Sequence, residues 1–434
     1  MSKKWKKYIP LLLLIVLFSS ISYSIGVYSF YYKIFPFNTS SKIEAKESKI
    51  SSAFYDFNMK SFNLPFTGKY GGIDLLNEQI LFISGDGDSF YLDEKNLKFK
   101  KIDKFNLDIN KKKFIKKYEK SFGKLKLKRR FGIKDIHIND FDNKKLLFLS
   151  SLYYNIKKDC YNLSLFSSKI TDEKNYKFSS PIKIFETKKC LKITNNLPSS
   201  TAYKLGKNFA PTSASGRIEK IDNQHILLTV GDFLYDGVNS EDLVQDLKSD
   251  YGKILKINIL DFSYEIFSIG HRNPQGLVVI DKDNIFSSEH GPYGGDEINK
   301  IEKDRNYGWP YYTYGTDYGA KNWPLSNKLK LKNYKEPIVS WTPSIAVSNL
   351  IFYNSEYLPK WKNNFIVSTL RDKNLHRITL SKDYSRMINI EKIKLNYRMR
   401  DIIVDNRGRI VILTDTKSNK ASPKIIILEN KKIN

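Results

Sequence analysis

The sequence predicts an all-β fold, a six-bladed β-propeller preceded by an N-terminal transmembrane helix. Six times along the chain, a polar turn containing Asp or Asn leads into an apolar, β-branched stretch, and helical patterns are scarce. These units begin near Asp74, Asp140, Ile221, Ile280, Tyr353 and Val404. Their spacing, roughly 50 to 80 residues, suits one four-stranded sheet with its loops per unit.

Small or acidic residues end several of the predicted strands, which favours blades around an axis over other β folds. These strand ends are Gly85–Asp86, Gly231–Asp232, Glu289–His290 and Thr414–Asp415. In a propeller, equivalent strand ends meet at one mouth of the central channel. A β-sandwich does not need six equivalent units, and a parallel α/β sheet would need helices between them. We therefore predict a propeller over 61–432.

The N-terminus has the pattern of an uncleaved signal anchor. Residues 1–7 include four lysines, and an apolar segment over 8–32 is long enough to span a bilayer. Flanking lysines favour a cytoplasmic N-terminus. A cleaved signal peptide and a buried soluble helix are the alternatives. The anchor predicts a serine- and lysine-rich stalk over 33–60 and a propeller on the extracytoplasmic, periplasmic side of the membrane.

Composition agrees with a folded, exported protein. The chain has 434 residues, 41% of them hydrophobic, and a formal net charge of +27. Such a charge attracts anionic partners, but export argues against nucleic acid. The two cysteines, Cys160 and Cys190, fit one disulfide in an oxidising compartment, with two unrelated buried thiols as the alternative. The lysine-rich stretch Lys111–Arg130 suits either a contact with anionic lipid or a solvated insertion between blades, and we favour the insertion.

A dense set of polar side chains between turns, Gly270–Asn299, is the first candidate site. Arg272 offers a planar fork of donors for an anionic oxygen, and Asn273 adds amide donors. The carbonyl groups of Gly291 and Pro292, together with the carboxylate of Asp296, are the hard oxygen ligands that Ca²⁺ prefers.

A second basic pair, Arg398 and Arg400, alternates along a predicted strand, so both guanidinium groups project from one face. With Arg272 and a calcium ion at one mouth, they would bind a small polyanion.

Five ordered motifs carry a resemblance to a known family. "GHRNPQGL", "SSEHGPYGGDEIN", "NYGWP", "PSIAVSNLIFY" and "RMRDI" resemble the soluble, pyrroloquinoline quinone (PQQ)-dependent sugar dehydrogenases, which include glucose/sorbosone and aldose sugar dehydrogenases. The motifs span roughly residues 215 to 416. The resemblance implies a six-bladed propeller that holds PQQ over a Ca²⁺ ion.

The resemblance also implies roles for individual residues. Arg272 would stand by the quinone carbonyl where negative charge develops, and Asn273 would help to hold the cofactor. The carbonyl groups of Gly291 and Pro292 would bind calcium. The remaining implied cofactor contacts are His290, Arg371, Arg398 and Arg400.

Two positions depart from the family pattern. Ser213 stands where the family has its catalytic histidine, and a serine hydroxyl is not a useful base near neutral pH unless another group activates it. Arg371 stands where the family has a lysine, which keeps the charge but changes the geometry. His290 is a candidate replacement base or a hydrogen-bonded histidine at a strand end.

The sequence therefore predicts a membrane-anchored, PQQ- and calcium-dependent dehydrogenase that oxidises a small sugar and passes electrons to an external acceptor. The alternative is a catalytically degenerate propeller that binds a sugar or envelope glycan without redox chemistry, as the Ser213 replacement suggests. A calcium-dependent hydrolase such as a lactonase is a third interpretation, without a distinguishing motif.

Overall fold

The computed structural model describes residues 9–32, 45–65, 71–125, 130–142, 144–193, 213–238, 240–319, 321–325, 334–416 and 421–431. They form two units, which are described separately. One contains helix α2 (Ile9–Tyr32) and the short segment Glu94–Lys98, and the other contains the rest of the chain from Ala45 onward.

The predicted anchor over 8–32 is not supported. Within the described residues, no helix combines the length and the apolar character that crossing a bilayer requires. Residues 1–7, predicted to be cytoplasmic, lie outside the described part of the chain.

Six antiparallel sheets, each four or five strands wide, make up the second unit, apart from one short parallel pair. The strands of each sheet are given from the innermost outward. The first sheet contains β3 (Gly71–Leu76), β4 (Gln79–Ser84), β5 (Ser89–Asp93) and β6 (Lys98–Ile102). The second contains β7 (Ile133–Phe141), β8 (Lys144–Asn155) and β9 (Cys160–Asp172), and both β10 (Lys177–Phe178) and β11 (Ile182–Glu186) pair with β9. The next two are β12 (Ser215–Lys220), β13 (His225–Val230), β14 (Lys253–Asn258), β15 (Tyr264–Ile269) and β19 (Arg305–Asn306); and β16 (Pro274–Asp281), β17 (Asn284–Glu289), β18 (Asp296–Ile301) and β20 (Val339–Trp341). The last two are β21 (Val347–Tyr353), β22 (Asn364–Thr369), β23 (Asn374–Leu380) and β24 (Met387–Lys394); and β25 (Met399–Val404), β26 (Ile410–Thr414), β27 (Lys424–Asn430), β2 (Asp56–Asn63) and β1 (Lys46–Ser51).

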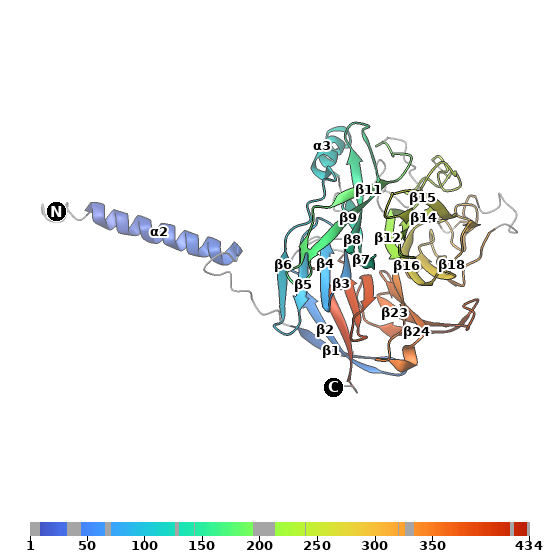
Figure 1. The fold of residues 1–434 in the computed structure, drawn as a ribbon. Helices are drawn as coiled ribbons and strands as arrows, with labels where there is room; N and C mark the ends of the chain where they lie inside the picture. Colours follow the sequence, from blue (N-terminus) through green and yellow to red (C-terminus); the bar gives the residue numbers. More distant parts are fainter. Residues whose placement is uncertain are drawn as a thin grey trace. The chain divides into compact units, whose positions relative to one another are not determined.

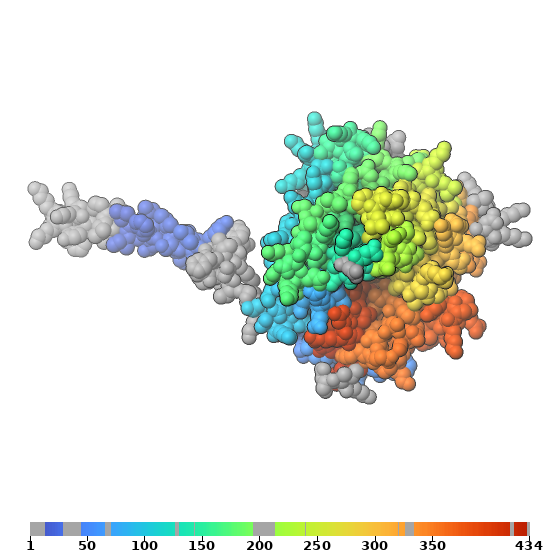
Figure 2. Space-filling model, in the orientation of Figure 1, coloured from blue at the N-terminus to red at the C-terminus, as the bar shows by residue number. Residues whose placement is uncertain are grey.

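The inner strands form a closed ring. Each packs against the next in the order β3, β7, β12, β16, β21 and β25, and β25 returns to β3. Figure 1 shows the labelled inner strands β3, β7, β12 and β16 side by side, with β6, β11, β15 and β24 toward the periphery. In the space-filling view, the colours follow one another around the face in sight, as sequential blades require (Figure 2). The predicted six-bladed β-propeller is confirmed.

The ring closes by pairing the two ends of the propeller, which corrects the predicted stalk. β2 pairs antiparallel with β27, from Phe57 opposite Asn430 to Asn63 opposite Lys424, and β1 adds to β2. Phe57 and Met59 point into the core, because alternate residues of β2 are buried. The propeller therefore begins at Lys46, and the rest of the predicted stalk, 33–44, lies outside the described residues.

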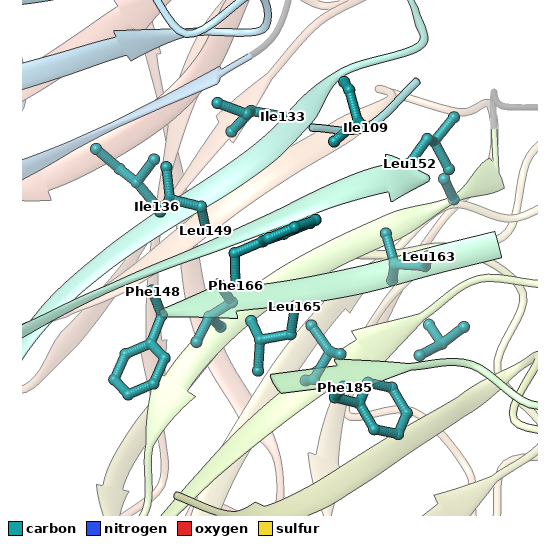
Figure 3. Packing of buried hydrophobic residues seen from close by; sticks show 14 of the residues in the cluster. Ile109, Ile133, Ile136, Phe148, Leu149, Leu152, Leu163, Leu165, Phe166 and Phe185 are labelled. Atoms are coloured by element: carbon teal, nitrogen blue, oxygen red, sulfur yellow. The ribbon is translucent and has the colours of Figure 1, made fainter. Parts of the chain in front are cut away.

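Apolar side chains fill the space between neighbouring blades. Figure 3 shows part of the largest cluster, where Ile133 and Ile136 of β7 lie near Leu149 of β8, and Leu165 of β9 lies near Phe185 of β11. Strands inside the blades, such as β13, β22 and β26, are buried along nearly their whole length, because successive side chains point to opposite faces and both faces pack against a neighbouring blade. The rigid ring fixes the ends of the inner strands, which hold the site.

Carboxylates at the channel wall join three consecutive pairs of blades. Asp401 of β25 accepts a hydrogen bond from the Ile73 amide of β3, at 3.1 Å. Asp74 of β3 accepts one from the Ile138 amide of β7 (2.6 Å), and Asp135 of β7 accepts one from the Ile218 amide of β12 (2.9 Å). Each carboxylate thus satisfies a main-chain donor of the next blade at the channel wall.

The cysteine prediction is confirmed: Cys160, at the start of β9, forms a disulfide with Cys190. The basic stretch contains helix α3 (Lys111–Phe122), which lies between β6 and β7 in the chain and buries Phe114 and Tyr118. Its lysines lie mostly on the solvent side, so the insertion between blades is confirmed.

Candidate functional site

A cavity of about 170 Å³ opens at the mouth where the inner strands begin. Its polar lining comes from four inner strands and the loops beside them, and basic groups outnumber acidic ones. The cations are Arg130, Lys134, Arg217, Arg398 and Arg400; the carboxylates are Asp135 and Asp415; the other polar side chains include Ser215, Asn273, Gln275 and His290. We call this the cationic cavity. A surplus of guanidinium and ammonium groups in a partly enclosed space favours an anionic ligand.

Arg398, just before β25, and Arg400, on β25, both line the cationic cavity, as their alternation along the chain predicts. Both approach the same carboxylate: Asp415 Oδ2 lies 2.9 Å from Arg400 Nη2 and 3.5 Å from Arg398 Nη2. Arg398 also donates to the Leu370 carbonyl at 2.8 Å. Its buried Nε has no hydrogen-bond partner among the described residues. This Arg398 donor is therefore available to a ligand.

Arg217, by contrast, is fully engaged in the wall of the channel. Its Nη1 lies 2.7 Å from Asp135 Oδ1 and 2.9 Å from Asp401 Oδ1, and its Nε donates to the Gln275 carbonyl. Burial raises the pKa of Asp135 to about 7, although the nearby Arg217 opposes the rise. This ion-pair cluster forms the floor of the cationic cavity.

Lys134 is the most deeply buried cation of the lining, at 8% exposure. Its Nζ donates to the Arg130 carbonyl at 2.5 Å. Its side chain runs along Gly216, where a Cβ atom would lie 2.9 Å from Lys134 Cβ. Burial, together with Arg130, Arg400 and Lys111, holds the pKa of the Lys134 amine well below its ordinary value.

Arg272 and Asn273 lie at the same mouth, at the turn into β16, but only Asn273 lines the cationic cavity. Arg272 is buried, with its guanidinium 5.3 Å from the ring of Trp309 and its Nη1 3.2 Å from the His290 carbonyl. It faces Asp232, whose pKa burial raises to about 7, against the influence of Arg272. The predicted arginine is therefore held between an aromatic ring and a buried carboxylate.

The loop after β17 holds the predicted metal ligands. Asp296 Oδ1 accepts from the Gly291 amide, and Oδ2 accepts from Ser344 Oγ (2.7 Å) and the Ala346 amide (2.6 Å). Burial opposes ionisation of Asp296, but these bonds and His290 outweigh it and lower its pKa. Asp296 thus braces the loop. No cluster of three or more His, Cys, Asp or Glu suited to a metal occurs in the described part of the chain.

His290 lines the cationic cavity, with Nδ1 3.8 Å from Asp296 Oδ1. Ser213 and Arg371 do not line it. Ser213 is 2% exposed, and its carbonyl accepts from the Phe233 amide, while the residues just before it lie outside the described part of the chain. Arg371 is exposed. Of the two positions that depart from the family pattern, neither brings its side chain to the cavity.

Sequence reasoning missed several lining residues. Gln275 follows Asn273 in a motif that drew attention, and Asp415 ends a strand that did, but neither was assigned a role. Arg130 and Lys134 gave no distinguishable signal, because they belong to or follow a stretch with many lysines. Only the closed ring brings them beside β25.

The fold and the site together define the class of protein, a β-propeller with a cationic cavity at one mouth of its channel. Residues 120–426 match the Glucose / Sorbosone dehydrogenase family model, which is well over half of the chain. The chain belongs to the Glucose / Sorbosone dehydrogenase family.

Two curated relatives and one solved structure illustrate the similarity. Aldose sugar dehydrogenase YliI of Escherichia coli is 36% identical over 166 residues, 37% of this chain and 44% of that relative. Quinoprotein glucose dehydrogenase B of Acinetobacter calcoaceticus is 26% identical over 363 residues, 64% of this chain and 72% of that relative. The PQQ-bound aldose sugar dehydrogenase of Streptomyces coelicolor has a TM-score of 0.56 at 18% identity, with 89% of this chain and all of that chain covered, which supports the fold. The chain thus spans less than half the length of the E. coli relative.

Proposed function

We propose that this protein is a PQQ-dependent sugar dehydrogenase whose cofactor occupies the cationic cavity. The observation that carries the proposal is the pair Arg398 and Arg400, which share one carboxylate and face a cavity with a surplus of cations. PQQ is a tricarboxylic quinone, so its charge matches this lining. The family membership and the names of the quinoprotein relatives support the same ligand.

The residues present fit such a group. Among the described residues, the buried Nε of Arg398 has no hydrogen-bond partner, and a carboxylate in the cavity would satisfy this donor. Arg398 and Arg400 would hold the carboxylates, and Asn273 and Gln275 would contact the polar edge of the ring system. When bound, PQQ supplies a quinone that accepts hydride from the sugar carbon. Arg272, fixed by Trp309 and Asp232, would stabilise the negative charge that develops there.

We propose calcium as a second cofactor, held by the carbonyl oxygens of Gly291 and Pro292. No hydrogen bond within the described residues uses either oxygen. Main-chain carbonyls are suitable calcium ligands. Asp296, predicted as a third ligand, is committed to the loop through three hydrogen bonds, and its bracing of Gly291 keeps the two carbonyl groups in place.

The proton acceptor is the part of this proposed chemistry in which the chain departs from the family pattern. Ser213 is buried and lies outside the cavity lining, so it does not replace the family's histidine by position. His290 lies in the lining with a carboxylate behind it, the arrangement that orients a general base. We assign the proton transfer from the sugar hydroxyl to His290 on this placement.

The same observation on Ser213 favours a second candidate, a propeller that binds a sugar or glycan and has lost redox chemistry. Both candidates place the propeller outside the cytoplasm, where a disulfide such as Cys160–Cys190 persists. The dehydrogenase additionally needs an external electron acceptor.

Titration of the full-length chain with PQQ, with and without Ca²⁺, followed by a panel of aldoses, tests the proposal. Binding and then bleaching of the quinone absorbance on sugar addition is the expected result. Binding without reduction would favour the degenerate propeller, and absence of binding would overturn the cofactor assignment. His290→Gln should retain binding but lose reduction, with Ser213→Ala as the matched control that keeps both.

A further inference from the structure

Arg272 adjoins a buried chain of three hydrogen-bonded side chains. His271 lies between the other two: its Nδ1 is 3.1 Å from Glu289 Oε2, and its Nε2 is 2.8 Å from Ser268 Oγ. All three side chains are buried. The second carboxylate oxygen, Glu289 Oε1, accepts a hydrogen bond from the Arg272 main-chain amide at 2.7 Å. Glu289 therefore links the imidazole of His271 to the main chain of Arg272.

A hydroxyl, an imidazole and a carboxylate in this order resemble a hydrolytic triad, but their position does not suit hydrolysis. The hydroxyl group of such a triad attacks a bound substrate. Ser268 is 1% exposed and does not line the cationic cavity. The Glu289 end of the chain, by contrast, reaches the proposed site, through the hydrogen bond to Arg272 and through His290, the next residue.

Glu289 is one of two residues that hold the main chain of Arg272. On the other side, the Asp232 amide donates a hydrogen bond to the Arg272 carbonyl at 2.8 Å. Asp232 Oδ2 also accepts a hydrogen bond from Trp309 Nε1 at 3.0 Å, and the Trp309 ring faces the Arg272 guanidinium. These contacts fix the point at which the Arg272 side chain begins and the ring along which it lies.

The segment Tyr307–Trp309 covers both His271 and Arg272. Tyr307 stacks on the imidazole, with ring centroids 4.8 Å apart and ring planes 25° apart. The main-chain amides of Tyr307 and Trp309 donate to the carbonyl groups of the two residues before His271, at 2.9 and 3.1 Å. A shift of the imidazole would therefore disturb the packing of Arg272 as well.

We propose that His271 and Glu289 are positioning residues that set the place of the Arg272 guanidinium at the quinone. The inference rests on the proposed function. Burying an imidazole and a carboxylate costs desolvation free energy, and well-packed apolar side chains of similar volume are often as stable or more so. That cost falls where a proposed site residue takes its main-chain acceptor. A role in positioning Arg272 accounts for this placement, whereas stability alone does not.

Two substitutions at His271 separate positioning from packing. Asparagine places its amide nitrogen near the position of Nδ1, so His271→Asn can still donate a hydrogen bond to Glu289. Glutamine places its amide nitrogen near the position of Nε2, so His271→Gln reaches Ser268 but not Glu289. Both variants lose the ring that stacks on Tyr307, so the bond to Glu289 is the difference between them.

Three measurements on each full-length variant test the proposal: PQQ affinity by absorbance titration, the midpoint potential of the bound quinone, and the rate of its reduction by an aldose in a single turnover. His271→Gln should slow reduction about tenfold or more and lower the midpoint potential, because a displaced guanidinium stabilises the reduced quinone less. PQQ affinity should change less than about threefold, since Arg398 and Arg400 are untouched. His271→Asn should keep most of the rate and of the potential.

The same two substitutions combined with Arg272→Met show whether the effect passes through Arg272. The midpoint potentials of the two double variants should then be equal. Equal behaviour of His271→Asn and His271→Gln in the otherwise unmodified chain, or a difference that persists with Arg272→Met, would overturn this inference and leave the proposed function intact.

Thermal unfolding checks that each variant folds. If neither substitution at His271 folds, Ser268→Ala, which removes only the outermost hydrogen bond, decides: we expect reduction about threefold slower, and an unchanged rate and potential would overturn the inference. If the unmodified chain binds PQQ without reducing it, the midpoint potentials alone decide the inference, while the dehydrogenase proposal fails. Absence of PQQ binding by the unmodified chain would overturn both.

Discussion

Two cavities lie along the channel of the propeller, and their charged groups are used in opposite ways. The cationic cavity at the mouth is basic, whereas a second cavity of about 250 Å³ is lined by the carboxylates Asp74, Asp135, Glu219 and Asp401. We call the latter the acidic cavity. Arg217 and Asp135 line both and separate them.

The two cavities differ in the hydrogen bonds that their charged groups make. Three carboxylates of the acidic cavity accept hydrogen bonds from main-chain amides of the neighbouring blade, so they stabilise the ring of blades. In the cationic cavity, Arg398 keeps an unpartnered Nε, within the described residues, and shares a single carboxylate with Arg400. A cluster of charges whose hydrogen bonds are made within the fold holds neighbouring blades together, and we call it a joint. A cluster with a donor that the fold does not use can bind a ligand.

We expect the largest loss of stability when a carboxylate that joins two blades is removed. Asp401→Ala removes the acceptor of the Ile73 amide, of Asn349 and of Arg217 at once. Arg217 would keep Asp135 but lose one of its two carboxylates, and the buried Ile73 amide would lose its acceptor, so the free energy of unfolding should fall by about 3–5 kcal/mol. Urea denaturation followed by tryptophan fluorescence measures this loss.

Asp283→Ala is the matched control, because the Asp283 side chain is 77% exposed and pairs only loosely with Lys282. It should change stability by less than about 0.5 kcal/mol. If Asp401→Ala were equally mild, the carboxylates of the acidic cavity would not be structural, and a ligand role for them would have to be reconsidered.

The next effect is on the ligand site. Arg400→Met should weaken PQQ binding by about 100-fold, since a buried cation then no longer meets an anionic group of the cofactor. The free energy of unfolding should change much less than in Asp401→Ala, because Asp415 would still pair with Arg398. Quinone absorbance titration gives the affinity, and thermal unfolding gives the stability. If Arg400→Met instead lowered the stability strongly and left PQQ affinity unchanged, Arg400 would belong to the structural charges and not to the ligand site.

The pH dependence of stability tests the structural role of the acidic cavity. Burial raises the pKa of Asp74 to about 7, even though two backbone amides oppose the rise. The folded protein then keeps a proton between about pH 4 and pH 7 that the unfolded chain has released, so this stabilising contribution is complete below pH 4 and lost as the pH rises through 7.

Asp74→Asn should therefore flatten the decline of unfolding free energy over that window by up to about 1.4 kcal/mol per pH unit. Urea denaturation across a pH series measures the slope. Asp283→Ala again serves as the control, and an unchanged slope in Asp74→Asn would mean that Asp74 is ionised in the fold.

The sequence predicts the ring and part of the site, for identifiable reasons. The six turn-and-strand units and the alternation of Arg398 and Arg400 are local patterns, and the structure follows them. The pairing of β2 with β27 could not be predicted, because it joins segments from opposite ends of the chain. Lys134 was missed for the same reason: its position beside Arg400 depends on ring closure.

The smallest expected effect concerns Asp415, the carboxylate within the cationic cavity. Its Oδ2 lies 2.9 Å from Arg400 and 3.5 Å from Arg398, so in the free protein it partly neutralises the groups that would hold PQQ. Asp415→Asn keeps an acceptor oxygen and removes the charge. Less charge then has to be displaced by the ligand, and PQQ affinity should rise about threefold to tenfold while the free protein loses some thermal stability. Quinone absorbance titration of this variant beside Arg400→Met decides between two roles: higher affinity identifies Asp415 as an internal counterion, whereas weaker binding would show that it orients the two guanidinium groups and belongs with the joint.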